Sequence, residues 1–431
     1  MGVRHLSQHW HFYQPRDNDY WTARITDECY RPNSENGILE TISFNIGPTL
    51  IDWLEKEDHE TLDKMISADR GQAMGQPYNQ RILPLARYDE DISTQIRWGK
   101  EHFRKYFGRY PRGMWLPETA SDSRTCRLMA DEGIEYTIGA WWQAKDEGGS
   151  LVDPSQAYKI ELGDGKSMTY FLFHPLSAEI AFNSEAAERT PFLNNADVAV
   201  DSIVRRSRED SLVLLAYDGE TFGHHHKMAD LWAAYFPTAA QHHPDAEMVT
   251  LDEYLDTHGA LAKAWLVEKS SWSCLCGGLK RWGGGCTCAP DLEGYREEML
   301  DVLQEQEDKV HDIFNSTAQR YLHDPWKARD DYVHVLLGEE TFEDFIHKHL
   351  KRSVSEQDTS ALKKLFRAEY LTQLSFTSCG WFFPDVNIQT LRNIKDAFAA
   401  SDEVKGAVGQ DISSRLKSLD RIIRPSPLAR Q

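Results

Sequence analysis

A run of five apolar residues at 212–216 (LVLLA) is followed at once by the polar sequence YDGETFGHHH. A continuous apolar run of this length is typical of a parallel strand that is buried on both faces. Short extended segments and helical segments alternate through the first two-thirds of the chain. We expect strands at 3–13, 113–116, 136–142, 168–173 and 248–251, and helices at 48–67, 89–107 and 122–132. This alternation predicts an α/β fold with parallel pairing, in a barrel or an open sheet.

The character of the chain changes near residue 291, where helical segments follow one another with little strand signal. The length of 431 residues accommodates a barrel of roughly 200–250 residues and a second domain. We therefore expect a catalytic barrel over 1–262, a Gly- and Cys-rich loop over 263–290 and a helical domain over 291–431.

Charge and composition exclude several classes of partner. The formal net charge is −20, with 68 acidic against 48 basic residues. Nucleic-acid binding relies on basic residues that neutralise phosphates, so no nucleic-acid partner is expected. No stretch approaches the ~20 apolar residues of a membrane span, and the N-terminal sequence lacks an apolar signal core. We expect a cytoplasmic protein without a membrane partner, whereas nothing in the sequence indicates the oligomeric state.

Two acidic segments follow predicted strands. Glu118 ends the sequence GMWLPE, in which Pro117 interrupts strand pairing. Asp218 and Glu220 follow the buried strand at 212–216, and the glycines beside them permit close approach of a ligand to the backbone. Barrel enzymes carry catalytic groups at the C-terminal ends of their strands, and glycoside hydrolysis needs two carboxyl groups. The alternative is that these acids are helix caps or solvated loop residues.

Histidines occur in two places near these acids. His9 and His11 are two residues apart on one predicted strand, so both project from the same face. They could hydrogen-bond sugar hydroxyls, bind a metal or form a structural pair in a polar core. The run His224–His226 is either a solvated turn or a set of ligands.

Four of the seven cysteines cluster as Cys274, Cys276, Cys286 and Cys288. Four thiolates form a tetrahedral zinc set, and the surrounding glycines allow the backbone to fold around an ion. The C-x-C spacing is less usual than C-x₂-C, and the alternative is a loop with four free thiols. The other three, Cys29, Cys126 and Cys379, are expected to be packing residues.

Five segments together resemble family 57 of the glycoside hydrolases. They are HWHFYQP near the N-terminus, GQAMGQPYNQRILPLA at 71–86, MWLPETA at 114–120, YDGETFGHH at 217–225 and VTLDEYL at 249–255. They resemble the five motif regions of the family, in order. The TSCGWFF stretch at 377–383 also resembles the helical part of such proteins.

The resemblance implies an incomplete (β/α)₇ barrel with a C-terminal helical domain, and retaining activity on α-glucans as an amylase, glucanotransferase or branching enzyme. It implies Glu118 as the nucleophile and Asp218 as the general acid/base, with no cofactor required for catalysis. The family's second motif often has His where this chain has Gln80, which would alter the sugar subsite. Candidates for binding the glucan are the polar and aromatic side chains in or beside the motifs: His9, His11, Gln14, Gln80, Trp115, Trp142, Glu220 and His224.

Two other functions remain as alternatives. A metal-dependent polysaccharide deacetylase would use His9, His11 and the 224–226 histidines as ligands, but it would have no need of Glu118. A catalytically weak glucan-binding barrel is the second alternative, and the intact pair of Glu118 and Asp218 argues against it.

Overall fold

The computed structural model describes residues 2–182, 195–288, 296–382 and 388–408. Their contacts form two compact units: Met1–Gln76 with Phe103–Trp272, and Pro77–His102 with Ser273–Gln431. These units differ from the predicted domains in two respects. Residues 77–102 belong to the second unit, and the first unit continues to Trp272. Residues 289–295 and 409–431, which fall in the predicted loop and helical domain, lie outside the described residues.

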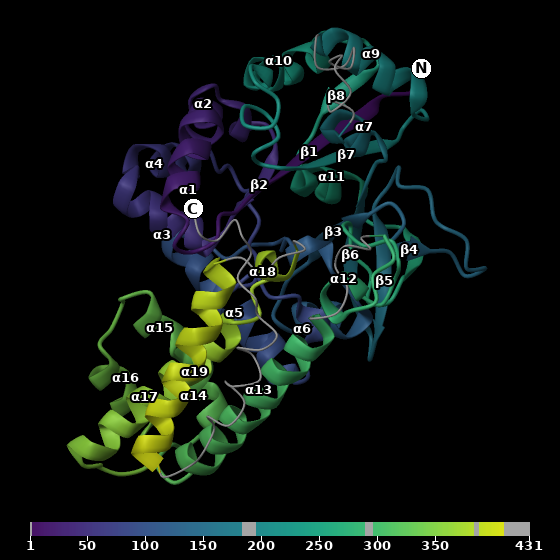
Figure 1. Ribbon diagram of the computed structural model, residues 1–431. Coiled ribbons are helices and arrows are strands. Elements are labelled where there is room, and N and C mark those ends of the chain that lie inside the picture. Colours follow the sequence, from purple (N-terminus) through teal and green to yellow (C-terminus); the bar gives the residue numbers. More distant parts are fainter. Residues whose placement is uncertain (1, 183–194, 289–295, 383–387, 409–431) are drawn as a thin grey trace. The chain divides into compact units, whose positions relative to one another are not determined.

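The first unit contains a sheet of nine strands among its described residues (Figure 1). The strands are β1 Arg4–Phe12, β2 Ser43–Ile46, β3 Tyr136–Ala140, β4 Ala144–Lys145, β5 Tyr158–Gly163, β6 Lys166–Phe173, β7 Leu212–Asp218, β8 Ala246–Met248 and β9 Ala262–Leu266. The apolar run at 212–216 lies in β7, and these five residues are buried between parallel neighbours.

Seven parallel segments of this unit close into a ring. Strand β1 pairs with β2 and β7, β7 pairs with β6, and β6 pairs with β3. Residues 73–75 and 113–114 complete the ring through three single bridges. These join Phe44 to Ala73, Gly75 to Met114, and Gly113 to Tyr136. The prediction of a strand at 113–116 was therefore wrong in detail, because only these bridges form there. A ring of seven parallel segments, two of them rudimentary, is an incomplete (β/α)₇ barrel.

Helices connect these segments. They are α1 Asp19–Ile25, α2 Arg31–Glu35, α3 Pro48–Glu57, α4 His59–Ser67, α6 Ser123–Asp131, α7 Leu176–Phe182, α9 Ala196–Arg206, α10 Ala229–His242 and α11 Leu251–His258. The single helix predicted at 48–67 is two, because Asp58 leaves helical geometry and its side chain caps α4 by accepting from the Thr61 amide. Helix α5 Asp89–Phe107 has the predicted bounds.

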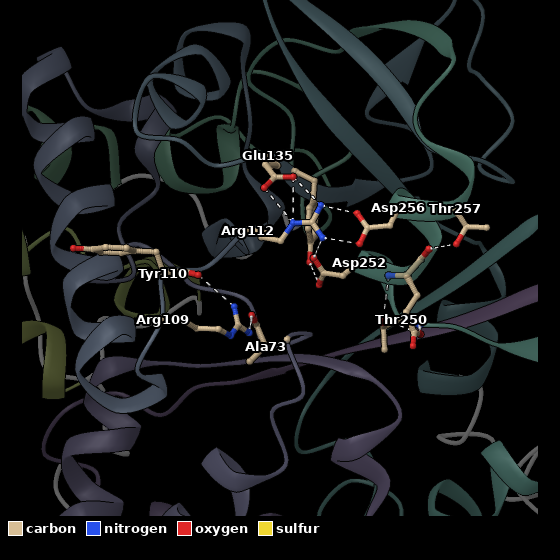
Figure 2. Close-up of polar contacts among 12 residues, drawn as sticks. Ala73, Arg109, Tyr110, Arg112, Glu135, Thr250, Asp252, Asp256 and Thr257 are labelled. Carbon is tan, nitrogen blue, oxygen red and sulfur yellow. Dashed lines mark hydrogen bonds and ion pairs between the residues drawn. The ribbon is translucent and has the colours of Figure 1, made fainter.

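Arg112 forms ion pairs with three carboxylates at one end of the barrel. Figure 2 shows its guanidinium among the carboxylates of Glu135, Asp252 and Asp256, with ion pairs of 2.9, 3.2 and 2.9 Å. Glu135 immediately precedes β3, so this cluster lies at the N-terminal ends of the strands. Charged residues at that end of a barrel serve stability rather than catalysis.

The second unit is helical. Besides the first part of α5, it contains α12 Lys280–Gly283, α13 Arg296–Ala318, α14 Pro325–Asp331, α15 Val333–Leu336, α16 Phe342–His349, α17 Glu356–Leu374, α18 Cys379–Phe382 and α19 Ile388–Val408 (Figure 1). Its apolar core includes Phe314, Phe345 and Phe366. Within the described residues, no helix combines the length and apolar character needed to cross a membrane.

A buried ionic network crosses the core of this helical unit. Arg329 contacts Asp91 at 2.8 Å and Glu369 at 3.1 Å, and Arg81 contacts Glu307 at 2.7 Å. His311 lies 3.2 Å from Asp91 and 3.4 Å from Glu369. Because these side chains are buried, each charge depends on its partners for solvation.

Candidate active site

The C-terminal ends of three adjacent strands bring polar side chains to one rim of the barrel. His11 on β1 is the register partner of both Asn45 on β2 and Asp218 on β7. Register partners on parallel strands point to the same face of a sheet. A polar row therefore crosses the three strands, in the order Asn45, His11, Asp218. It lies at the C-terminal ends of the strands, where enzymes of this fold class carry their catalytic groups.

Glu118 lies in a tight turn immediately after the segment that contains Trp115. Leu116 is extended, and Pro117–Thr119 form one 3₁₀ turn in which Glu118 and Thr119 have φ values of 58° and 49°. Left-handed backbone is costly for residues other than glycine, and it is rarest for β-branched residues such as Thr. Two successive residues in this conformation, one of them the predicted nucleophile, indicate a turn that the surroundings hold in place.

Gln143 and Trp272 hold that turn. Gln143 is fully buried, accepts from the Thr119 hydroxyl at 2.7 Å and donates to the Thr119 carbonyl at 2.9 Å. The backbone amide of Trp272 donates to the Thr119 hydroxyl at 2.9 Å and to the Glu118 carbonyl at 3.1 Å. The backbone groups of the strained turn are thereby satisfied by two segments remote in sequence.

The side chain of Glu118 is half-buried and accepts a hydrogen bond from the indole of Trp272, at 3.0 Å from Nε1 to Oε2. The Trp272 ring meets the Trp115 ring edge-on at 5.1 Å, and Trp115 stacks on His9 and His11 at 4.8 and 5.2 Å. Aromatic rings in mutual contact thus connect Glu118 with the polar row on β1.

Asp218 is the last residue of β7. Asp218 keeps an exposed fraction, as a group that meets a substrate must, although the surrounding protein desolvates its carboxyl group. Burial raises the pKa of Asp218 well above its ordinary value, and the negative charges of Glu220 and Glu118 raise it further. The two predicted catalytic carboxyl groups are therefore close enough to interact electrostatically, and Asp218 has the environment of a proton donor.

Glu220 is anchored by two neighbours from the start of the chain. Its Oε1 accepts from Gln14 at 2.7 Å and from the Tyr30 hydroxyl in a short hydrogen bond. Burial raises the pKa of Glu220, although these hydrogen bonds oppose the rise. Gln14 and Glu220, which belong to two different motifs, thus form one polar cluster with Tyr30.

His9 and His11 are held by strand β2. His9 contacts the Ser43 hydroxyl at 3.1 Å and the Asn45 amide oxygen at 3.0 Å, and His11 contacts the same oxygen at 3.2 Å. Burial lowers the pKa of His9 to about 3 and that of His11 to about 4, while Asn45 opposes both shifts. Both rings are therefore neutral at pH 7. His9 is fully buried and His11 is 7% exposed, and a role of either ring in sugar binding stays a prediction.

Three other residues that were predicted to bind the sugar contact other parts of the protein. The Trp142 indole donates to the Ser271 carbonyl at 3.1 Å. His224 pairs with Glu28 at 2.5 Å, a contact that helps lower the pKa of Glu28 to about 2 after the larger effect of Lys227. Gln80 is buried in the second unit, where its carbonyl accepts from the Ser378 amide at 2.8 Å. A role in sugar binding for these three residues stays a prediction.

The glycines that follow Asp218 have a different role from the predicted one. A Cβ atom on Gly219 would lie 2.3 Å from the Phe12 ring, and one on Gly223 would lie 2.3 Å from the Glu28 carbonyl oxygen. Both glycines are needed because protein, rather than a ligand, approaches the backbone there.

Five residues of the site were not predicted from the sequence: Tyr30, Asn45, Gln76, Gln143 and Trp272. Asn45 donates to Gln76 at 2.6 Å, and Gln76 belongs to the GQAMGQP segment whose motif could have indicated it. Trp272 has no comparable signal, because 154 residues separate it from Glu118.

Potential metal ligands gather in two places among the described residues, Cys274–Cys276–Cys286–Cys288 and Asp91–Glu307–His311. The second group is paired with the guanidinium groups of Arg81 and Arg329, which already supply its positive charge. Neither set includes the histidines that a deacetylase would need in the barrel. The donor geometry therefore disfavours that alternative.

A family model described as glycosyl hydrolase family 57 matches residues 8–262, and a model for a domain of unknown function, DUF3536, matches residues 295–420. Residues 263–294, which include the four clustered cysteines, lie between the two matched ranges.

Two curated relatives are α-amylases. Alpha-amylase 1 of Dictyoglomus thermophilum is 26% identical over 225 residues, covering 49% of this chain and 31% of the relative. The alpha-amylase of Pyrococcus horikoshii is 26% identical over 224 residues, covering 49% and 33%. The chain spans about a third of the length of these relatives.

Solved structures share the fold. An exo-type maltose-forming amylase from Pyrococcus sp. ST04 aligns with a TM-score of 0.76 at 15% identity, covering 97% of this chain and 82% of that one. A branching enzyme from Pyrococcus horikoshii aligns with a TM-score of 0.66 at 15% identity, covering 97% and 93%. The 4-α-glucanotransferase of Thermococcus litoralis gives 0.63 at 17% identity, covering 94% and 60%. The predicted α/β fold, an incomplete (β/α)₇ barrel with a C-terminal helical region, is confirmed.

Proposed function

This chain belongs to glycosyl hydrolase family 57, and we propose that it cleaves or transfers α-glucan chains with retention of configuration, through a covalent glycosyl-enzyme intermediate. The observation that carries the proposal is the pair of carboxyl groups that follow two barrel segments, Glu118 in its left-handed turn and Asp218 at the end of β7. The charge of Glu118 is among the causes that raise the pKa of Asp218. Two carboxyl groups whose environments differ in this way supply a proton donor and a nucleophile at one pH.

Glu118 is the nucleophile in this proposal. Its strained turn fixes the carboxylate against the Trp272 indole, whose N–H stabilises negative charge on Oε2. Attack on the anomeric carbon forms a glycosyl ester at Glu118 and releases the leaving oxygen. The neutral imidazole of His11, in register beside Asp218, orients a hydroxyl of the sugar at the cleaved bond.

Asp218 is the acid and then the base. In the resting enzyme its raised pKa keeps the proton that the leaving oxygen needs. Formation of the ester removes the negative charge of Glu118, which is one cause of that raised pKa. Asp218 then holds its proton less tightly and can activate the acceptor, which is water in hydrolysis or a glucan hydroxyl in transfer.

The glucan substrate is supported by family membership and by the α-amylases among the relatives. Trp272, which is partly exposed, provides a flat surface that packs against the C–H face of a sugar ring, and the fully buried Trp115 ring supports it edge-on. A cytoplasmic location is part of the proposal, because seven cysteines without disulfide bonds suit a reducing compartment.

Azide rescue of two variants tests the roles. Glu118→Ala is expected to lose turnover of an activated α-maltosyl substrate and to recover it with azide, giving a glycosyl azide of inverted configuration. Asp218→Ala is expected to give a retained azide, because its nucleophile is intact. The opposite pairing of variants and products would exchange the two roles, and failure of both variants to respond would refute the two-step mechanism.

The acceptor is tested by incubating the wild-type protein with maltoheptaose and separating the products by length and linkage. Shorter products alone indicate hydrolysis, longer linear products indicate chain transfer, and new α-1,6 linkages indicate branching. An unchanged maltoheptaose pool would count against an α-glucan substrate.

A further inference from the structure

The second unit contains a compact cluster of four thiols that the glycosidase mechanism does not use. Cys274 and Cys276 precede α12, and Cys286 and Cys288 follow it. Their four sulfur atoms lie within 4.8 Å of one another. The loop that carries them, 273–288, lies between the two ranges that family models match.

We propose that Cys274, Cys276, Cys286 and Cys288 bind one zinc ion in tetrahedral tetrathiolate coordination. Zinc–sulfur bonds of ~2.3 Å at tetrahedral angles place neighbouring sulfurs roughly 3.8 Å apart. The Cys274–Cys286, Cys276–Cys286 and Cys274–Cys288 separations are 3.7, 3.8 and 3.9 Å, and the Cys286–Cys288 separation is 3.1 Å. Three of these distances match the edges of such a tetrahedron, and the fourth needs a small widening.

The backbone around the sulfurs has the form of a metal-binding loop. The glycine pairs Gly277–Gly278 and Gly284–Gly285 all have positive φ, between 63° and 97°. Each pair turns the chain back sharply, one just after the first two cysteines and one just before the last two. The loop therefore directs side chains from both C-x-C segments toward a single point.

Hydrogen bonds also reach two of the four sulfur atoms. The Cys288 amide donates to the Cys276 sulfur at 3.2 Å, and the Thr287 hydroxyl lies 3.2 Å from the same atom. The backbone amides of Cys276 and Arg281 donate to the Cys274 sulfur. Donors of this kind stabilise thiolates and orient them toward a metal.

Arg281 links this loop to its surroundings within the second unit. Its guanidinium donates to the Ser273 carbonyl at 2.9 Å and lies over the Phe382 ring at 4.0 Å. Its positive charge partly offsets the net charge of −2 of a zinc ion with four thiolates. Zinc therefore has a structural role, in which the ion keeps the two ends of a glycine-rich loop together.

Elemental analysis of the full-length protein, purified without chelator, is the primary test. We expect about one zinc per chain, and loss of that zinc in the Cys276→Ser/Cys288→Ser double variant. Cys379→Ser is the matched control, since Cys379 is a half-buried thiol of the same unit outside the cluster, and it should retain the ion.

A second measurement keeps the proposal testable where the double variant fails to fold. Wild-type protein exchanged with Co²⁺ should give the intense thiolate-to-cobalt absorption and the visible bands of a tetrahedral site. Chelation should make trypsin cleavage after Lys280 or Arg281 roughly tenfold faster, because an unconstrained loop opens more often. The proposal is overturned by protein that neither contains zinc nor takes up Zn²⁺ or Co²⁺ after reduction, or by iron as the stoichiometric metal.

Discussion

Replacing Trp272 by Phe separates the hydrogen bond that Trp272 makes to Glu118 from the packing of its ring. Phenylalanine retains an aromatic surface against Trp115 but lacks the indole N–H that lies 3.0 Å from Oε2 of Glu118. A hydrogen bond to a charged group contributes about 1.5–3 kcal/mol, and the half-buried position of Glu118 favours the lower value.

The direction of the expected shift follows from the charge state of Glu118 that this hydrogen bond stabilises. The indole donates to the ionised carboxylate, so its removal disfavours ionisation by about 1.5 kcal/mol, which corresponds to roughly one pH unit. The acidic limb of kcat/KM against pH should therefore move up by about one unit in Trp272→Phe. Below that limb the variant should be about tenfold slower than wild type, and on the plateau the difference should be small.

Trp142→Phe is the matched control, because the Trp142 indole donates to a neutral acceptor, the Ser271 carbonyl, at 3.1 Å. Its acidic limb should stay at the wild-type position. The measurement is kcat/KM from pH 4 to 9 on a chromogenic maltooligosaccharide, with circular dichroism to verify folding. A loss in Trp272→Phe that is uniform across pH, or an equal shift in the control, would refute the electrostatic role.

Two further perturbations test the charges around the site and in the helical unit. Glu220→Gln removes one negative charge that raises the pKa of Asp218, so the basic limb of kcat/KM should move to lower pH, on the order of one unit, when rates are measured on the same substrate. His311→Gln removes a cation from the buried network and should lower the free energy of unfolding by about 3–5 kcal/mol in urea titrations. Burial alone lowers the pKa of His311, but Glu369 and Asp91 raise it to about 10, so its stabilising effect is full below about pH 6.5 and is lost as pH rises through about 10. The stability difference between wild type and variant should shrink over that window, and a difference that grew with pH would contradict the assignment.

The sequence predicted the elements whose signals are local. The apolar run at 212–216 became part of β7. Helix α5 has the predicted bounds because its apolar periodicity and the Gly108 that follows it, with a φ of 69°, are local signals. Two predictions failed in detail, one because strand pairing did not extend and one because a residue inside the expected helix became a cap. The segment at 113–116 forms only single bridges, and Asp58 divides the helix predicted at 48–67.

The parts of the site that the sequence did not predict depend on contacts between distant segments. Glu118 was visible from its motif, whereas its partner Trp272 comes from a segment with no strand or helix pattern of its own. The buried network in the second unit was invisible for a related reason. Arg81, His311 and Arg329 are polar residues that a periodicity argument assigns to a solvated face, and only tertiary packing buries them against carboxylates.

The left-handed turn at Glu118 has a cost that its hydrogen bonds must offset. Two non-glycine residues in this conformation cost about 1–2 kcal/mol each. The Thr119 hydroxyl makes two buried hydrogen bonds, to Gln143 at 2.7 Å and from the Trp272 amide at 2.9 Å, and these contribute about 1 kcal/mol each. The hydroxyl alone therefore offsets a large part of the strain.

Thr119→Val removes the hydroxyl and keeps the shape of the side chain, so the turn should relax and Glu118 should leave its reactive position. A loss of about 2 kcal/mol in transition-state stabilisation corresponds to roughly a 30-fold fall in kcat, and KM should change little because remote sugar contacts persist. Thr137→Val is the control, since the Thr137 hydroxyl is equally buried and donates to the Met114 carbonyl at 2.7 Å, away from the turn. Both variants should lose similar stability in thermal unfolding, but only Thr119→Val should lose kcat. Equal losses of kcat in both would mean that destabilisation of the barrel, rather than the position of Glu118, limits the reaction.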